Sequence, residues 1–316
     1  MNNHFESLGQ KQRESIRDNL PMQLELARKL ESVYEHRPDI RNFEGAMKGT
    51  KQESEYTKEA IQKDVEYVDS TRAKIEEKNS SQGKEVLDST EIGFQLSEIL
   101  QAMIVDRLNN HWFKNFQAIM TSDYDDLRSG IDAVLKHETG VQLGASFDFT
   151  VATQEKIIYK KLKDEWEKHV VKGSVPVLKY YEDPDTHEKK SLLVPRFIIG
   201  ATVADVEELA HAYINNDSAI LDNHPFKYLM LQQIEEQLQS VLDEYELNPD
   251  PKYDFAKKKY EAIQKLLRIM KNDIHLDEET SISVHEYSKK SVALDMMRRF
   301  RIMRQSISGA LPDEAE

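Results

Sequence analysis

The chain has 316 residues, of which 32% are charged and 39% hydrophobic, with a formal net charge of −14 and no cysteine. This length allows one large domain or two modest ones, and the lack of cysteine excludes disulfides and thiolate metal sites. The negative charge disfavours indiscriminate nucleic-acid binding, because affinity for phosphates comes mostly from Lys and Arg, and no apolar run approaches the roughly 20 residues that cross a bilayer.

The N-terminal sequence MNNHFESLGQ lacks the basic start, apolar core and small-residue cleavage site of a secretory signal. We therefore expect a protein that stays in water, with the cytoplasm as its default compartment and no contact with a membrane.

Residues 1–85 are expected to form a helical extension with little core of its own. Apolar residues recur at helical spacing from about Met22 to Tyr34, and the pattern stops before Pro38. In a second segment, from residue 56 to 78, a narrow apolar stripe runs between many charges, which is typical of a helical hairpin or a coiled-coil arm.

Residues 86–215 are expected to form an α/β core. A long helix is predicted from Ser89, and Glu98 lies on its apolar face, which is the pattern of a buried helix that carries one acid. The periodicity then changes to that of strands. The predicted strands cover 117–126, 129–137, 141–152, 174–181 and 190–201, with a helix over 153–171 between the third and the fourth.

Residues 216–316 are expected to form a helical bundle against the core. Helical patterns cover 226–247, 255–270 and 292–307. The last of these contains MMRRFRIMR at 296–304, which we interpret as a solvated basic face beside an apolar stripe. The helical regions leave room for a homo-oligomer or for a protein partner.

Two carboxylates fall at unusual positions in the predicted strands. Asp132 lies in the apolar run GIDAVL, and Asp148 lies between Phe147 and Phe149. A buried, unpaired carboxylate costs several kcal/mol unless something neutralises it. Since the two acids are equidistant from a turn near Gly140, they are expected to lie opposite one another, as two ligands of a metal.

Hard cations such as Mg²⁺ or Mn²⁺ take carboxylate, carbonyl and water oxygens, and Glu98 on the preceding helix would supply a third oxygen. Other interpretations of the acids stay open. Asp132 could instead be held by backbone amides, or by Arg128 or Arg196. Two further acids, Asp125 and Asp126, would either assist the metal from the strand edge or simply occupy a turn.

The order helix, three strands with an acid on the second and on the third, helix, strand resembles the PD-(D/E)XK nuclease superfamily over residues 89–214. The resemblance implies a restriction-endonuclease-like fold, with a mixed central α/β sheet flanked by helical regions. It also implies that Asp132, Asp148 and Glu98 hold a metal together with the carbonyl of Phe149. The implied activity is metal-dependent phosphodiester hydrolysis in DNA or RNA.

The chain departs from this pattern at the lysine that the family places two residues after the second acid, because Thr150 stands there. Lys156 and Lys160 on the following helix are candidate substitutes, as is Gln154. Both lysines fall opposite the Ile158 face, however, and this favours a solvated role for them.

The sequence is compatible with two functions from different classes. The first is a Mg-dependent nuclease, and the second is a degenerate nuclease fold that serves as a non-catalytic binding or scaffold protein. The missing lysine and the acidic charge favour the second function. A third alternative, a purely helical interaction protein, would leave the strand-like runs unexplained.

Overall fold

The computed structural model describes residues 26, 29–44, 46, 56–81, 89–110, 112–137, 144–151, 155–274 and 278–308. Its strands are β1 (Phe116–Met120), β2 (Ala133–His137), β3 (Ala145–Val151), β4 (Val177–Glu182), β5 (Lys189–Leu193) and β6 (Arg196–Ala201). Its α-helices are α3 (Glu31–Glu35), α4 (Lys58–Ser81), α5 (Ser89–Asn110), α6 (Asp123–Ser129), α7 (Glu155–Glu165), α8 (Val203–Ile214), α9 (Ser218–Asn223), α10 (Pro225–Leu247), α11 (Asp254–Asn272), α12 (Glu278–Lys289) and α13 (Val292–Ser308). Shorter helical turns are η1 (Ile40–Phe43), η3 (Trp166–Val170) and η4 (Pro251–Tyr253).

The centre of the molecule is a four-stranded sheet in the order β1-β2-β3-β6. The first three strands pair antiparallel, whereas β6 runs parallel to β3. A parallel neighbour needs a crossover connection, which α7 and the β4–β5 hairpin provide. The predicted mixed sheet with flanking helices is thus confirmed, and the purely helical alternative is wrong.

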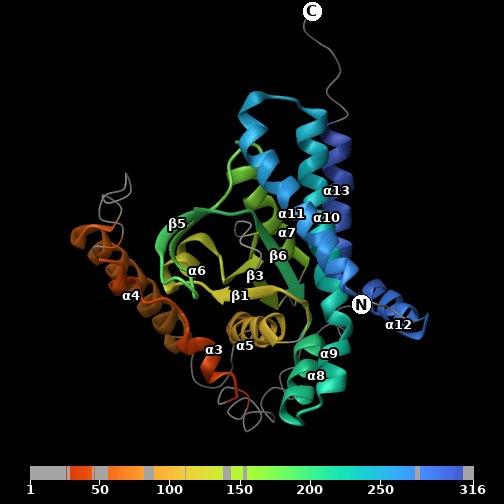
Figure 1. Ribbon diagram of the computed structural model, residues 1–316, viewed down its shortest axis with the longest axis horizontal. Helices are drawn as coiled ribbons and strands as arrows, with labels where there is room; N and C mark the ends of the chain where they lie inside the picture. The colour runs from red at the N-terminus through yellow and green to blue at the C-terminus, as the bar shows by residue number, and fades with distance from the viewer. Residues whose placement is uncertain are drawn as a thin grey trace, which may run out of the picture.

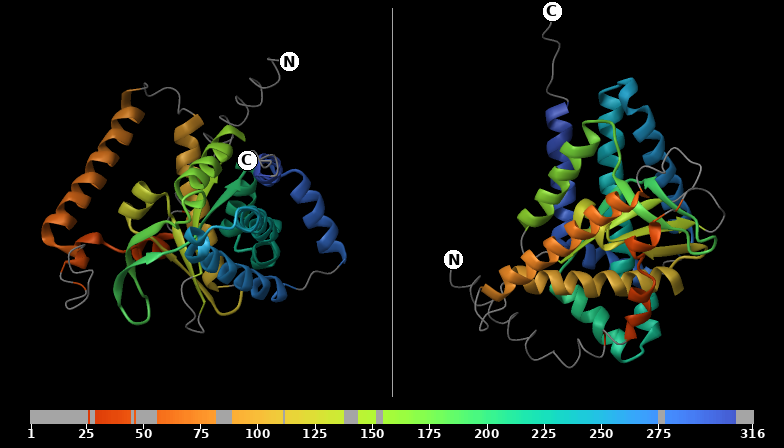
Figure 2. Two further views of the ribbon diagram at one scale, coloured as in Figure 1. Left: turned by 90° about the horizontal axis from the view of Figure 1, so that it is seen from above. Right: turned by 90° about the vertical axis from the view of Figure 1, so that its left-hand side faces the viewer.

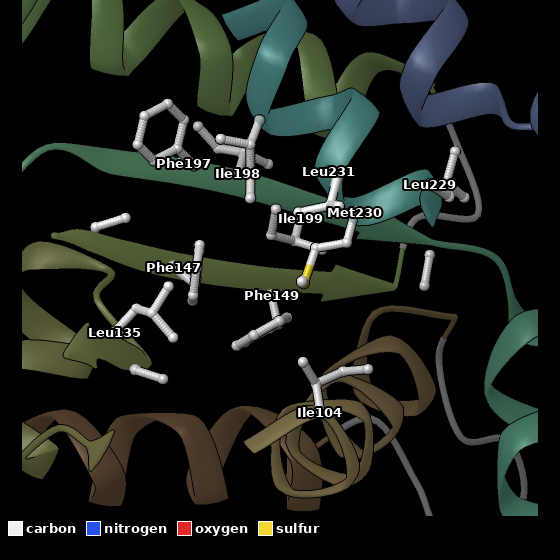
Figure 3. Close-up of a cluster of buried hydrophobic side chains, with 14 of the residues drawn as sticks. Ile104, Leu135, Phe147, Phe149, Phe197, Ile198, Ile199, Leu229, Met230 and Leu231 are labelled. Atoms are coloured by element: carbon white, nitrogen blue, oxygen red, sulfur yellow. The ribbon is translucent and has the colours of Figure 1, made fainter. Parts of the chain in front are cut away.

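One face of the sheet packs on α5, and α7 lies over the other (Figure 1). Most described apolar side chains of α5 are buried, among them Leu100 and Ile104. In Figure 3, Ile104 projects toward the sheet beneath Phe149, while Met230 and Leu231 of α10 lie beside β6. All seven residues of β3 are buried, since both faces of this strand are covered.

The outer edge of β6 is closed by two glutamine side chains from α10 instead of another strand. Gln237 accepts from the backbone N–H of Ile198 at 2.9 Å and donates to its carbonyl at 2.8 Å. Gln233, one turn earlier on α10, does the same for Gly200 at 2.7 and 2.9 Å. These amides satisfy buried backbone groups that would otherwise be unpaired.

The predicted strand 190–201 is wrong as a single element. It divides into β5, which pairs with β4 in a separate two-stranded sheet, and β6 of the central sheet. Pro195 lies at the division because it has no N–H to continue a ladder, while its carbonyl accepts from the N–H of Ser146 at 2.8 Å.

The described part of the N-terminal extension packs on two parts of the molecule. Its buried apolar residues from Ile40 to Val68 form one cluster with Tyr180 of β4, whereas Leu26 and Leu30 join the main core. Phe43 of η1 meets the Tyr180 ring edge-on at 5.1 Å. Seen from above, α4 lies on the opposite side of the sheet from α10 and α11 (Figure 2).

The C-terminal helices share one apolar core with the sheet, and α10 packs between α11 and α13 (Figure 1). The arginines of α13 are mostly paired with acids. Arg301 contacts Glu236 and Asp243 of α10 at 3.2 and 3.3 Å, and Arg298 contacts Glu236 at 3.3 Å. None of the helices in the described ranges is long and apolar enough to cross a membrane.

Candidate functional site

The register of the central sheet brings Asp132 and Asp148 together. Ala133 of β2 pairs with Phe147 of β3, so the preceding position, Asp132, lies opposite Asp148. Asp132 immediately precedes β2 instead of lying inside it, but its N–H still donates to the carbonyl of Phe147 at 2.8 Å. The predicted juxtaposition of the two acids is confirmed, whereas the turn near Gly140 lies outside the described residues.

The Asp132 carboxyl group is held by the protein on two sides. Its Oδ2 accepts from the backbone N–H of Phe149 at 2.6 Å, and the Asp126 carboxyl lies within hydrogen-bonding reach. Burial raises the pKa of Asp132 well above its usual range, and the charges of Asp126 and Asp148 raise it further. The contact that Phe149 makes is therefore through its N–H, whereas the resemblance implied a role for its carbonyl.

The segment before Asp132 is a helix, and the predicted strand over 117–126 is wrong beyond Met120. Ser122 caps α6 by accepting from the N–H of Asp125, and Gly130 ends it in the left-handed region at φ 62°. Asp125 is fully buried and accepts from the N–H groups of Lys179 and Tyr180, so it joins α6 to β4. Asp126, in contrast, faces Asp132.

The lysine next to the acid pair is Lys161 of α7. Its Nζ donates to Asp148 Oδ1 at 2.5 Å. The Lys161 side chain is 34% exposed, whereas the Asp148 side chain is only 6% exposed. Lys156 and Lys160 are exposed, with no described ion-pair partner. Gln154 lies outside the described residues.

Arg196, at the start of β6, ties the neighbouring elements to the same acid. Its Nη2 lies 2.7 Å from Glu165 Oε2, and its Nη1 lies 3.9 Å from Asp148 Oδ2 and donates to the carbonyl of Ser129. Burial raises the pKa of Glu165 to about 7, and Arg196 opposes this rise. A Cβ on Gly130 would lie 2.6 Å from Arg196 Nη1 and would have to adopt the left-handed φ of 62°, so glycine is favoured there.

The N-terminal extension reaches the cluster through Arg37, which donates to Asp123 at 2.5 Å and to Asp126 at 2.9 Å. Glu98 lies on this side, but the prediction that it is buried in an apolar face is wrong, because its side chain is exposed. Partial desolvation raises the pKa of Glu98, and Arg37 opposes this rise. No group of three histidine or acidic residues in the described ranges is arranged to hold a metal ion.

Comparison with models of protein families, with curated proteins and with solved structures finds no match for this chain.

Sequence reasoning did not select Lys161 or Arg37. A signal for Lys161 was present, because it follows Ile158 by three residues and therefore borders the buried face of α7, unlike Lys156 and Lys160. No local signal points to Arg37, which comes from a segment 89 residues before Asp126 in the chain.

Asp132→Asn is expected to raise the free energy of unfolding at neutral pH in EDTA. The unfolded chain loses the Asp132 proton near pH 4, while the folded protein keeps it to higher pH, so the wild type loses stability as the pH rises from 4 toward 7. The gain is about 1.4 kcal/mol per pH unit over which only the folded state holds the proton. Urea unfolding at several pH values measures it. Asn keeps an acceptor for Phe149, and an equal gain at pH 4 and pH 7 would contradict the assignment.

Proposed function

We propose that this protein hydrolyses phosphodiester bonds of nucleic acid with the help of a divalent metal, as the resemblance to the PD-(D/E)XK superfamily implies. The observation that carries the proposal is the Lys161 Nζ contact with Asp148 Oδ1. It supplies, from α7, a lysine beside the second acid that Thr150 cannot supply from β3. Support also comes from the element order α5, β1, α6, β2, β3, α7, β4, β5, β6, in which β6 runs parallel to β3.

The donor set suits Mg²⁺ or Mn²⁺ in chemical terms. Mg²⁺ keeps several waters and needs only one or two carboxylates together with substrate phosphates, so a pair of acids is sufficient without a third protein ligand. Asp132 and Asp148 would hold the metal. The negative charges of Asp126 and Asp148 both raise the pKa of Asp132. A bound cation would offset this repulsion among the three acids. Such a bound metal would polarise the phosphodiester and acidify a water.

The chain's own residues would do the remaining work. Lys161 would orient the attacking water and offset the negative charge that develops on the phosphorus oxygens. Arg196 would hold Asp148 and the end of α6 in place, because it contacts both. Asp126, on the described geometry, is a better candidate than Glu98 for a third acid, since it lies against Asp132.

A degenerate nuclease fold that binds without catalysis is the second candidate function. It is favoured by the internal neutralisation of the cluster, in which Lys161 pairs with Asp148 and Arg37 pairs with Asp126. In this function the acids would serve mainly to hold β2, β3 and the extension together.

Calorimetric titration with MgCl₂ and MnCl₂ tests the proposal directly. We expect the wild type to bind metal, and Asp148→Asn to lose at least about tenfold in affinity because a ligand is removed. Asp126→Asn is expected to weaken binding more than Glu98→Gln does. Asp69→Asn, an exposed carboxylate on α4, is the matched control and should bind as the wild type does.

Metal binding that disappears with Asp148 would justify a cleavage screen with single-stranded DNA, duplex DNA and RNA. If the wild type takes up neither metal, even in the presence of a short duplex, the nuclease proposal fails and the binding function takes its place. Circular dichroism of each variant shows whether the fold is retained.

A further inference from the structure

The outer face of α7 carries a row of lysines. Lys156, Lys160 and Lys163 are spaced at i, i+4 and i+7, which places them on one side of the helix, about 6 Å apart along its axis for each step of four residues. All three are exposed. In the described part of the chain, Lys156 and Lys160 have no ion-pair partner, and Lys163 has only Glu167 of the next turn at 3.6 Å.

Helix α13 lies side by side with α7 and places an arginine beside Glu155, the acid next to the lysine row. The Tyr159 and Phe300 rings meet at 6.0 Å, and Figure 2 shows the two helices adjacent. Arg299 of α13 reaches the Glu155 carboxylate at 3.5 Å while it stays 60% exposed. Arg299 therefore offsets part of the charge of the acid that precedes Lys156, although it also pairs with Asp295 of its own helix.

The lysine row differs from those basic residues of the described chain that pair with acids. Arg298 and Arg301 form ion pairs with Glu236 of α10, and Lys136 forms one with Asp183. An exposed row of three lysines, of which only Lys163 has an ion-pair partner in the described part of the chain, is a local exception on a chain of net charge −14. It fits a partner that presents negative charges at regular intervals.

The row and Lys161 lie on the same helix, on different faces. Lys161 follows Lys160 in sequence and points about 100° further round α7, where its side chain reaches Asp148. A phosphate that approaches the acids would be repelled by them, so a basic surface next to the cluster would be needed to hold it.

We propose that the outer face of α7, formed by Lys156, Lys160 and Lys163, binds the sugar-phosphate backbone of a nucleic-acid strand that leads to Asp132 and Asp148. This inference deepens the proposed function, on which it rests, by naming the surface that holds the substrate. The contacts are ionic and therefore independent of base sequence.

The test is the fluorescence anisotropy of one labelled oligonucleotide sequence, prepared as single-stranded DNA, duplex DNA and RNA, in EDTA so that no cleavage occurs. The test protein is the triple variant Lys156→Glu, Lys160→Glu, Lys163→Glu. Its matched control carries Lys258→Glu, Lys265→Glu and Arg268→Glu on the exposed side of α11, with the same change in net charge. Thermal melting checks both folds, which surface substitutions should change little.

We expect the α7 variant to lose about tenfold or more in affinity for at least one probe. Its plot of log affinity against log salt should become shallower by roughly 2 to 3, since each of the three lost phosphate contacts contributes about 0.9 on a duplex and about 0.7 on a single strand. The control should stay within about twofold of the wild type. Equal losses in both triple variants, or no binding of any probe by the wild type at low salt, would overturn the inference.

Failure of this inference is distinguishable from failure of the proposed function. If metal binds at Asp148 but the α7 lysines have no effect on nucleic-acid affinity, the proposed hydrolysis stands and the substrate must bind on another surface. That result overturns the inference. Binding through the α7 lysines without any metal binding would uphold the inference and identify the protein as a non-catalytic nucleic-acid binder.

Discussion

Under the proposed hydrolysis, replacing Lys161 by methionine is expected to lower the rate of phosphodiester cleavage by about 10²- to 10³-fold, because the cationic donor proposed to face the reacting phosphate is lost. The loss should fall on kcat, since the proposed substrate-binding row of Lys156, Lys160 and Lys163 is unchanged. Initial rates over a range of oligonucleotide concentrations, at saturating Mg²⁺, separate kcat from KM.

Lys160→Met is the control for this measurement, because its side chain is exposed and adjacent in sequence but has no described contact with the acid pair. It should raise KM slightly and leave kcat unchanged. Lys161→Arg keeps the charge and is expected to restore part of the rate. Lys161→Met also leaves Asp148 with only the distant Arg196, so a melting curve has to accompany the kinetics. An unaltered kcat in a folded Lys161→Met protein would show that Lys161 has no role in the reaction.

The largest expected loss of stability comes from the glutamines that close the edge of β6. Gln237→Leu keeps a buried apolar stem but removes the partners of the Ile198 N–H and carbonyl groups. Each buried backbone group left unpaired costs about 1–3 kcal/mol, so the variant with two such groups is expected to lose roughly 2–6 kcal/mol of unfolding free energy. Gln233→Leu should lose a similar amount, because it removes the partners of the Gly200 N–H and carbonyl groups. Urea unfolding measures the free energy of unfolding of both variants.

Gln239→Leu offers the matched control on the same helix. Its amide donates only to Asp243 one turn later, at 2.6 Å, so its replacement should cost about 0.5 kcal/mol or less. If Gln237→Leu proves as mild as Gln239→Leu, water or a shift of α10 must satisfy the backbone of β6. The idea that side-chain amides substitute for a fifth strand would then fail.

The effects expected for Lys161→Met and for Gln237→Leu arise at two places on the same sheet, the acid pair and the outer edge of β6. The Asp132 and Asp148 carboxyl groups lie close together in a poorly solvated region, which costs stability at neutral pH. The glutamines of α10 offset none of this charge, but they fix β6, and Arg196 on that strand holds Asp148 and Glu165. We therefore expect the site and the sheet edge to be coupled through β6.

The sequence by itself determined the alternation of elements and one pair of acids. Periods of 2 and 3.6 in the apolar pattern follow directly from strand and helix geometry, so the sheet strands, α5 and the C-terminal helices were predictable. The pairing of Asp132 with Asp148 followed from equal distances to a turn, because the register of a hairpin is set by local geometry.

Only the tertiary structure decided which charged groups complete the cluster. The choice of Lys161 over Lys156 and Lys160 depends on the rotation of α7 against the sheet, which packing sets and which the spacing of charges alone does not reveal. Arg37 meets Asp126 because the extension folds back over α6. Helix α6 forms where a strand was predicted, because its Ser122 cap and its Gly130 end outweigh the strand-like alternation of DYDDLRSGID. Contacts between distant segments arise from burial and are not encoded in any local pattern.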